Sequence, residues 1–189
     1  MVNEIWLVRH GATDWTGTHQ HTGRTDLALS SDGRREAAAL VKPLNRQLFD
    51  AVFTSPLRRA RETARIAGFA QAEVLNDLAE WDYGAYEGRT TAEIQEEIPG
   101  WSVWNDPIID GESIDDVAAR ATSVLARCAT VDGRVLLFAH AHILRILTAG
   151  ALGVAPTMGK VLGLESGSIS VLGSEHDYRV IRRWNWLPN

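Results

Sequence analysis

The feature that most constrains the fold is the alternation of short apolar runs with longer stretches of helical periodicity. Several of the apolar runs contain hardly any polar residue, which is typical of strands that are covered on both faces. The sequence predicts six strands, at residues 5–8, 51–54, 73–75, 135–138, 169–172 and 179–181. Strands that alternate with helices indicate an α/β domain with a largely parallel sheet.

The segments between these strands carry readable helix signals. The sequence predicts helices over residues 57–67, 114–128 and 141–152, and one from about 31 to 48. Ser113, followed three residues later by Asp116, resembles a capping box, and apolar residues at helical spacing follow it. Pro43 should kink or interrupt the helix that begins near Ser31, because proline cannot continue a helix without losing a hydrogen bond.

The fold class that follows is a three-layer α/β sandwich, with a mainly parallel central sheet and helices on both faces. We expect one domain over residues 1–189. Residues 84–111 break the alternation: apart from a short helical piece near 91–98, this segment has the pattern of a loop or lid.

Charge and composition exclude several functional classes. Nineteen Lys and Arg residues against 24 Asp and Glu residues give a net charge of −5, which argues against a nucleic-acid partner. The single cysteine, Cys128, excludes an internal disulfide and suits a reducing compartment. We see neither a signal peptide nor an apolar run long enough to span a bilayer. We therefore expect a cytoplasmic protein without a membrane partner; homo-oligomerisation stays open.

Polar side chains capable of chemistry follow four of the predicted strands. They are Arg9 with His10, then Arg58, then Glu80, and last His140. Ligands of open α/β sheets bind at the carboxyl ends of the strands, so these groups are expected to meet in one crevice. Guanidinium groups match phosphate oxygens, and the start of the helix near Arg58 adds amide donors. The set indicates a site for a phosphoryl group.

His10 is the candidate nucleophile of this site. A neutral imidazole nitrogen can attack phosphorus without the activating base that a serine hydroxyl needs. Gly11 directly after it permits a tight turn and a close approach of the backbone to a ligand. An alkoxide leaves poorly unless it is protonated, and Glu80 is the nearest candidate acid.

Five ordered motifs within residues 4–150 resemble those of the histidine phosphatase superfamily. They are Arg9-His10-Gly11-Ala12-Thr13 with Thr22-Gly23 and Asp26 to Gly33; Ser55-Pro56-Leu57-Arg58-Arg59-Ala60; Leu78-Ala79-Glu80 with Tyr83-Gly84; Gly111-Glu112-Ser113; and Phe138-Ala139-His140. Within the phosphoglycerate-mutase-like branch, Glu80 to Gly84 and the Trp101/Trp104 pair look most like broad-specificity acid phosphatases and sugar bisphosphatases.

The resemblance implies a phosphoglycerate mutase-like fold and hydrolysis of small phosphate monoesters, such as sugar phosphates, through a phosphohistidine, with no cofactor or metal. It implies His10 as nucleophile, Glu80 as proton donor, and Arg9, Arg58 and His140 as the phosphate pocket. The positions implied to contact the substrate are Thr16, Thr22, Gly23, Tyr83 and Ala141. Two of these depart from the family: Thr16 stands in place of a frequent asparagine, and Ala141 in place of the usual glycine.

Other interpretations remain open at this stage. A phosphoglycerate mutase would use the same phosphohistidine, and a binding module would hold phosphate without turnover. Arg89 is the one Lys or Arg between Arg65 and Arg120, and such a cation-poor lid favours hydrolysis over mutase activity. The pairs His19/His21 and His140/His142 could be metal ligands, but no carboxylates recur at ligand spacing. Trp101 and Trp104 are either core aromatics or part of a substrate mouth.

Overall fold

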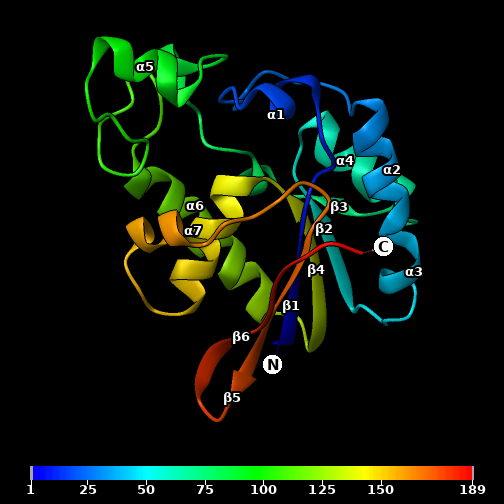
Figure 1. Ribbon diagram of the computed structural model, residues 1–189. Coiled ribbons are helices and arrows are strands. Elements are labelled where there is room, and N and C mark those ends of the chain that lie inside the picture. The colour runs from blue at the N-terminus through cyan, green and yellow to red at the C-terminus, as the bar shows by residue number, and fades with distance from the viewer. Residues whose placement is uncertain (1, 189) are drawn as a thin grey trace.

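The computed structural model describes residues 2–188 and contains a six-stranded sheet (Figure 1). The order across the sheet is β3-β2-β4-β1-β5-β6. The strands are β1 (Val2–Arg9), β2 (Ala51–Thr54), β3 (Glu73–Val74), β4 (Gly133–Ala139), β5 (Ile169–Glu175) and β6 (Tyr178–Trp186). The first four run parallel to one another, whereas β5 is antiparallel to β1 and to β6. The sheet is thus mixed and mostly parallel.

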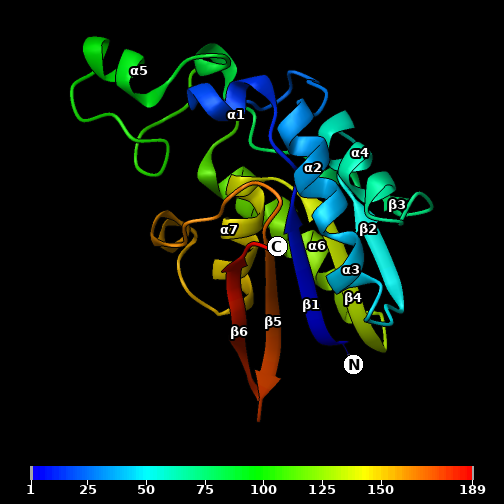
Figure 2. The same ribbon diagram turned by 45° about the vertical axis from the view of Figure 1, so that its right-hand side comes forward.

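Helices cover both faces of the sheet (Figure 2). They are α1 (Asp14–Thr18), α2 (Ser31–Ala39), α3 (Val41–Leu44), α4 (Arg58–Ile66), α5 (Thr91–Glu97), α6 (Ile114–Ala129) and α7 (Ala141–Ala151), with short 3₁₀ helices η1 (Asn76–Leu78), η2 (Gly84–Tyr86) and η3 (Pro156–Val161). Strand β4 divides its side chains between two cores: Val135 and Leu137 pack with α6 and α7, and Leu136 and Phe138 pack on the side of α2 to α4. The predicted three-layer α/β sandwich is confirmed.

The local signals that the sequence carries work as expected. All six predicted strands form, four of them longer than predicted. The side chain of Ser113 accepts a hydrogen bond from Asp116 N, and the Asp116 carboxylate accepts one in return, so the capping box starts α6. The helix predicted from Ser31 is interrupted, as Pro43 indicated, and forms α2 and α3. The short helix α1 was not predicted; its apolar spacing gives no helical signal.

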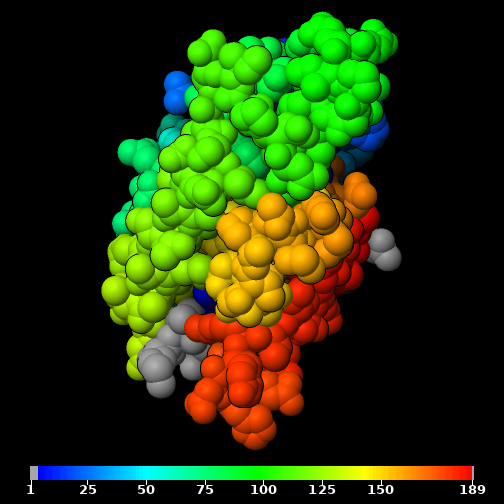
Figure 3. All heavy atoms as spheres, turned by 90° about the vertical axis from the view of Figure 1, so that its left-hand side faces the viewer, coloured from blue at the N-terminus to red at the C-terminus, as the bar shows by residue number. Residues whose placement is uncertain are grey.

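The segment 84–111 packs beside the α7–η3 layer (Figure 3). Trp101 is 1% exposed and Trp104 is 9% exposed, so both are core residues. Trp104 packs so closely on η3 that a side chain at Gly159 would meet it at 2.8 Å. Within residues 2–188, no helix combines the length and the apolar character needed to cross a bilayer.

Candidate active site

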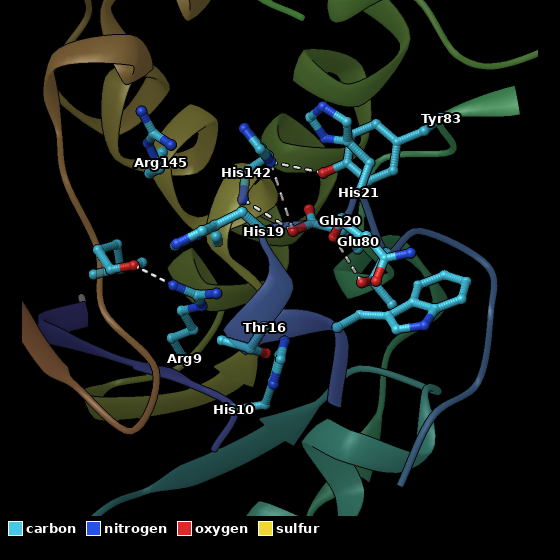
Figure 4. Close-up of a pocket in the computed structure, with 14 residues that line it drawn as sticks. Arg9, His10, Thr16, His19, Gln20, His21, Glu80, Tyr83, His142 and Arg145 are labelled. Atoms are coloured by element: carbon cyan, nitrogen blue, oxygen red, sulfur yellow. Dashed lines mark hydrogen bonds and ion pairs between the residues drawn. The ribbon is translucent and has the colours of Figure 1, made fainter. Parts of the chain in front are cut away.

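A polar cavity of about 220 Å³ lies where β1 ends and α7 begins (Figure 4). Fourteen residues line it: Arg9, His10, Trp15, Thr16, His19, Gln20, His21, Thr22, Glu80, Tyr83, Ala141, His142, Arg145 and Leu164. Figure 4 shows His10 and Thr16 at one end, with His142 and Arg145 towards the other. The carboxyl ends of parallel strands therefore carry the site, as the α/β pattern predicts.

The hydrogen bonds of His10 determine which of its nitrogens can react. Its Nδ1 lies 2.7 Å from the carbonyl oxygen of Gly11. A carbonyl can only accept, so Nδ1 carries the proton and Nε2 keeps its lone pair. Within residues 2–188, Nε2 makes no hydrogen bond and is not fully buried. The His10 nitrogen that keeps its lone pair is thus accessible from the cavity.

Electrostatics keep the His10 ring neutral. Burial, followed by the positive charges of Arg59 and Arg9, lowers the pKa of His10 well below its usual value. The ring is 6% exposed. A neutral imidazole at neutral pH is the form that can attack an electrophile.

His140 lies directly behind His10, with the two ring centroids 5.0 Å apart. Its Nδ1 accepts a 3.1 Å hydrogen bond from Nε of Arg59, so its Nε2 carries the proton and donates to Ser55 Oγ at 2.7 Å. His140 is fully buried and does not line the cavity. Burial and the Arg59 charge lower the pKa of His140 well below its usual value.

The guanidinium group beside His140 belongs to Arg59 and not to Arg58. Besides His140, Arg59 donates to the carbonyl oxygens of Thr22, Gly23 and Thr25, and it is fully buried. These bonds hold the loop between α1 and α2 against the start of α4.

The prediction that Arg58 belongs to the phosphate pocket is wrong. Its side chain is 62% exposed, lies 4.0 Å from the Glu62 carboxylate and lines a separate surface groove. Helix α4 begins at Arg58, and successive residues of a helix point about 100° apart. Only Arg59 of this pair can therefore face the site.

Glu80 lies against the start of α7. One oxygen, Oε1, accepts hydrogen bonds from the backbone amides of Trp81 and Ile143, and Oε2 accepts one from the amide of His142, each at 3.0 Å. The unpaired amides at a helix start attract such a carboxylate. Oε2 retains one lone pair for a further proton or ligand.

Two cations line the cavity wall. Arg9 donates to the carbonyl oxygen of Leu164, and its Nε is buried without a hydrogen-bond partner among the described residues. Arg145 donates to the carbonyl oxygens of Gly159 and Lys160 and stacks on the ring of Trp104, 4.5 Å from the centroid. Glu80 is the single acidic residue among the fourteen that line the cavity, so the wall suits an anion.

The structure brings most of the predicted substrate contacts to this cavity. Thr16, Thr22, Tyr83 and Ala141 line it. Gly23 does not; its amide donates to the Glu87 carboxylate at 2.9 Å. A side chain at Gly23 would meet the carbonyl oxygen of Trp81 at 2.4 Å, so glycine is required there by backbone packing.

Gly11 allows close packing of the backbone against α2 and α4, a role other than the predicted close approach to a ligand. A Cβ atom at this position would lie 2.2 Å from the carbonyl oxygen of Gly33, at the start of α2. Gly11 N donates to Oγ1 of Thr63 on α4. The glycine thus lets the turn after β1 press against two helices, which fixes the backbone of the preceding His10.

Sequence reasoning missed Arg59 behind the cavity and several residues that line it. They are Trp15, His19, Gln20, His21, His142, Arg145 and Leu164. A signal for two of them was present: His142 and Arg145 are three apart in the helix that follows β4, so they share a face with the predicted contact Ala141. Trp101 and Trp104, considered for a substrate mouth, instead pack behind His21 and His142.

The two histidine pairs do not come together with acidic or thiol groups as a metal site would require. Throughout the part of the chain that the structure describes, no three His, Cys, Asp or Glu side chains are placed to hold one ion. Among the candidate ligands, Nδ1 of His142 is bonded to the Tyr83 hydroxyl at 2.6 Å, and Nε2 of His21 lies 3.3 Å from Thr91 Oγ1.

Comparison with known proteins agrees with this arrangement. The family model of the histidine phosphatase superfamily, branch 1, matches residues 5–187. The chain belongs to this family.

Two curated phosphatases are similar along most of the chain. An acid phosphatase of Mycobacterium tuberculosis is 36% identical over 181 residues, covering 94% of this chain and 89% of that protein. A sedoheptulose 1,7-bisphosphatase of Saccharomyces cerevisiae is 33% identical over an alignment of 177 positions, with 76% of this chain and 65% of that enzyme covered. The solved structure of a Mycobacterium tuberculosis open reading frame superposes with a TM-score of 0.92, at 34% identity and with 99% of each chain covered. The chain is a phosphatase of the histidine phosphatase superfamily.

Proposed function

We propose that this phosphatase hydrolyses small phosphate monoesters through a phosphohistidine on Nε2 of His10, with Glu80 as proton donor and without a metal ion. The observation that carries the proposal is the free Nε2 of a neutral, oriented imidazole that opens into a cavity lined by Arg9. A nucleophile held in one tautomer needs no proton transfer before it attacks.

In the first step, Nε2 of His10 attacks phosphorus and the bond from phosphorus to the ester oxygen breaks. The leaving alcohol takes the proton that Glu80 carries when the substrate is bound. Arg9 lies on the cavity wall, and the charge of Arg59 acts from behind it, so both stabilise the equatorial oxygens during transfer.

In the second step, water attacks the phosphohistidine. Glu80 takes the proton of that water and inorganic phosphate leaves, which returns His10 and Glu80 to their starting states. The carboxyl therefore acts first as acid and then as base, as microscopic reversibility allows.

The positive charge around the cavity supports a metal-independent reaction. Arg9 and Arg145 line it and Arg59 lies behind it. These arginines can stabilise the negative charge of the phosphoryl group, as metal ions do in metal-dependent phosphatases. Full activity in excess EDTA is the expected result. Loss on chelation that a divalent ion restores would overturn this part of the proposal.

The far end of the cavity supports esters that carry a second acidic group. Arg145 is held there by two carbonyl oxygens and leaves Nη1 without a hydrogen bond to the described residues. The similarity to a sedoheptulose 1,7-bisphosphatase agrees with such a substrate, because a bisphosphate has a second anion.

A screen of phosphorylated metabolites, ranked by kcat/KM, tests the proposed activity. We expect phosphate release that disappears in His10→Ala. With 3-phosphoglycerate and a bisphosphorylated primer, we expect inorganic phosphate and little 2-phosphoglycerate. Interconversion of the two phosphoglycerates faster than phosphate release would establish a mutase instead.

A further inference from the structure

The imidazole of His142 is a cavity group that the proposed phosphoryl transfer does not use. It lies on the first turn of α7, and its side chain is 16% exposed, on the cavity side (Figure 4). Its backbone amide donates to Oε2 of Glu80, and its Nδ1 is 4.0 Å from that same oxygen. The ring of His142 therefore lies beside the carboxyl that we propose as the proton donor.

Aromatic packing fixes the ring of His142. Trp104 lies 5.0 Å away, Tyr83 lies 5.8 Å away and Trp81 lies 6.0 Å away, all measured between ring centroids. Three large, buried neighbours leave the imidazole one orientation. A donor or acceptor on such a ring is preorganised, which lowers the entropy lost when it binds a ligand.

The tautomer of His142 follows from its contact with Tyr83. The phenol oxygen of Tyr83 lies 2.6 Å from Nδ1. Burial, reinforced by the charge of Glu80, raises the pKa of Tyr83 well above its usual value, so the phenol keeps its proton. We assign the donor role to that hydroxyl, because Nδ1 is the one acceptor that it contacts within residues 2–188. Nε2 of His142 must then carry the ring proton.

This Nε2–H has nothing to donate to inside the protein. Within the described chain it makes no hydrogen bond, and it is not among the fully buried unpaired atoms, so it opens into the cavity. The ring is also uncharged, because burial and the nearby Arg145 lower the pKa of His142 well below its usual value. A neutral donor is suited to a neutral oxygen, whereas Arg9 and Arg145 serve the anions.

We propose that His142 Nε2–H binds a hydroxyl of the leaving alcohol, and so selects phosphate esters of polyols. This inference rests on the proposed function, since Glu80 defines where the ester oxygen lies. The ring of His142 lies beside the Glu80 carboxyl with Nδ1 as the nearer nitrogen, so Nε2–H faces a part of the alcohol beyond the ester oxygen. Ester substrates without a hydroxyl there leave the Nε2–H unpaired in a closed site, which costs transition-state stabilisation.

Three substrates that differ in a single hydroxyl test the inference. They are 1-propyl phosphate, 1,2-propanediol 1-phosphate and 1,3-propanediol 1-phosphate. For the wild-type protein we expect kcat/KM of the better diol ester to exceed that of the propyl ester about tenfold, the effect of one good hydrogen bond. Comparison of the two diol esters then shows which carbon carries the hydroxyl that Nε2–H reaches.

Variants then assign the preference to His142. His142→Phe keeps the aromatic packing and removes the donor, so the ratio of the two kcat/KM values should fall to about one. His142→Gln carries a side-chain amide that reaches about as far as Nε2 and should restore part of the ratio. His176→Asn, in the exposed turn between β5 and β6, should keep the wild-type ratio. Because each ratio is taken on one protein sample, partial unfolding of a variant does not change it.

The possible outcomes distinguish a failure of the His142 proposal from a failure of the proposed phosphatase activity. Hydrolysis of all three esters with the same ratio in wild type and His142→Phe would overturn the role of His142 and leave the phosphatase proposal intact. A wild-type protein that releases phosphate from none of the three would overturn both.

Discussion

The wall of the cavity that carries His10 differs in construction from the wall opposite. We call the first the catalytic floor, made of Arg9 and His10 with Arg59 and His140 behind them, and the second the selecting wall, made of Tyr83, His142 and Arg145. In the floor, both nitrogens of His140 are hydrogen-bonded within the protein, and Arg59 donates four hydrogen bonds. The one reactive atom that stays free is Nε2 of His10.

The selecting wall comes from α7 and from the loop after Glu80, and it leaves donors facing the cavity. Its aromatic and carbonyl partners fix each side chain but use only part of its hydrogen-bonding capacity. The difference shows that one fold can keep the same reaction in the catalytic floor while the residues of the selecting wall determine which substrate binds. Changes in the floor should therefore affect every substrate, and changes in the selecting wall should affect substrates unequally.

The largest effect is expected for His10→Ala. Removal of the nucleophile should lower kcat on every substrate by about 10⁴-fold or more, since no other nitrogen in the floor has a free lone pair. Steady-state phosphate release measures this effect, and His176→Ala is the control for loss of an exposed histidine. Retention of a tenth of the wild-type rate in a folded His10→Ala sample would refute the role of the floor.

Glu80→Gln should come next, and its effect should depend on the leaving group. Alkyl phosphates need a proton on the departing oxygen and should lose about 10²–10⁴-fold in single-turnover phosphorylation. An aryl phosphate such as 4-nitrophenyl phosphate leaves as its anion and should lose much less. Equal losses for both substrates would mean that Glu80 holds the start of α7 but does not donate the proton.

Comparison of Arg59→Ala with Arg58→Ala tests which of the two arginines belongs to the catalytic floor. Arg59→Ala should lower kcat/KM about 10²–10³-fold because a buried cation next to His140 is lost. Arg58→Ala removes an exposed side chain and should change kcat/KM less than about twofold. Arg59→Lys, which keeps the charge but not the fork, should fall between them. A larger loss in Arg58→Ala than in Arg59→Ala would reverse the assignment.

The last effect concerns stability and its dependence on pH, with no change in the catalytic groups. Burial is the first cause that lowers the pKa values of His10, His21, His140 and His142 in the folded state. Unfolded histidines take up a proton below about pH 6.5, whereas these four stay neutral, so the unfolded state binds more protons. The free energy of unfolding should therefore decrease as pH falls from about 7.5 to 5.5, by up to about 1.4 kcal/mol per histidine and pH unit. Urea titrations measure it; a flat profile would contradict the neutral floor.

The fold was largely predictable because its signals are local. Apolar runs gave all six strands, and Ser113 and Pro43 gave a helix start and a break. The place of His10 in the cavity was equally accessible to sequence reasoning, since His10 directly follows a strand and the strand ends of such a sheet converge.

The wrong predictions concern residues whose placement depends on the direction of a side chain around its helix, or on packing between segments that are distant in the sequence. Arg58 and Arg59 are neighbours in the sequence, and the exact start of α4 decides which one turns inward; sequence signals fix helix starts only to within a residue or two. The role of Gly11 depends on the backbone of Gly33, and the burial of Trp104 depends on η3. No local pattern records such contacts.

The most direct test of the account is to trap the covalent intermediate. The protein would be mixed with ³²P-labelled substrate for milliseconds, quenched in alkali, digested and mapped, because phosphohistidine survives alkali but not acid. We predict label on the peptide that contains His10, attached at Nε2, and none in His10→Ala. Label on His142 or another residue, or label of wild-type stoichiometry in His10→Ala, would contradict the central claim.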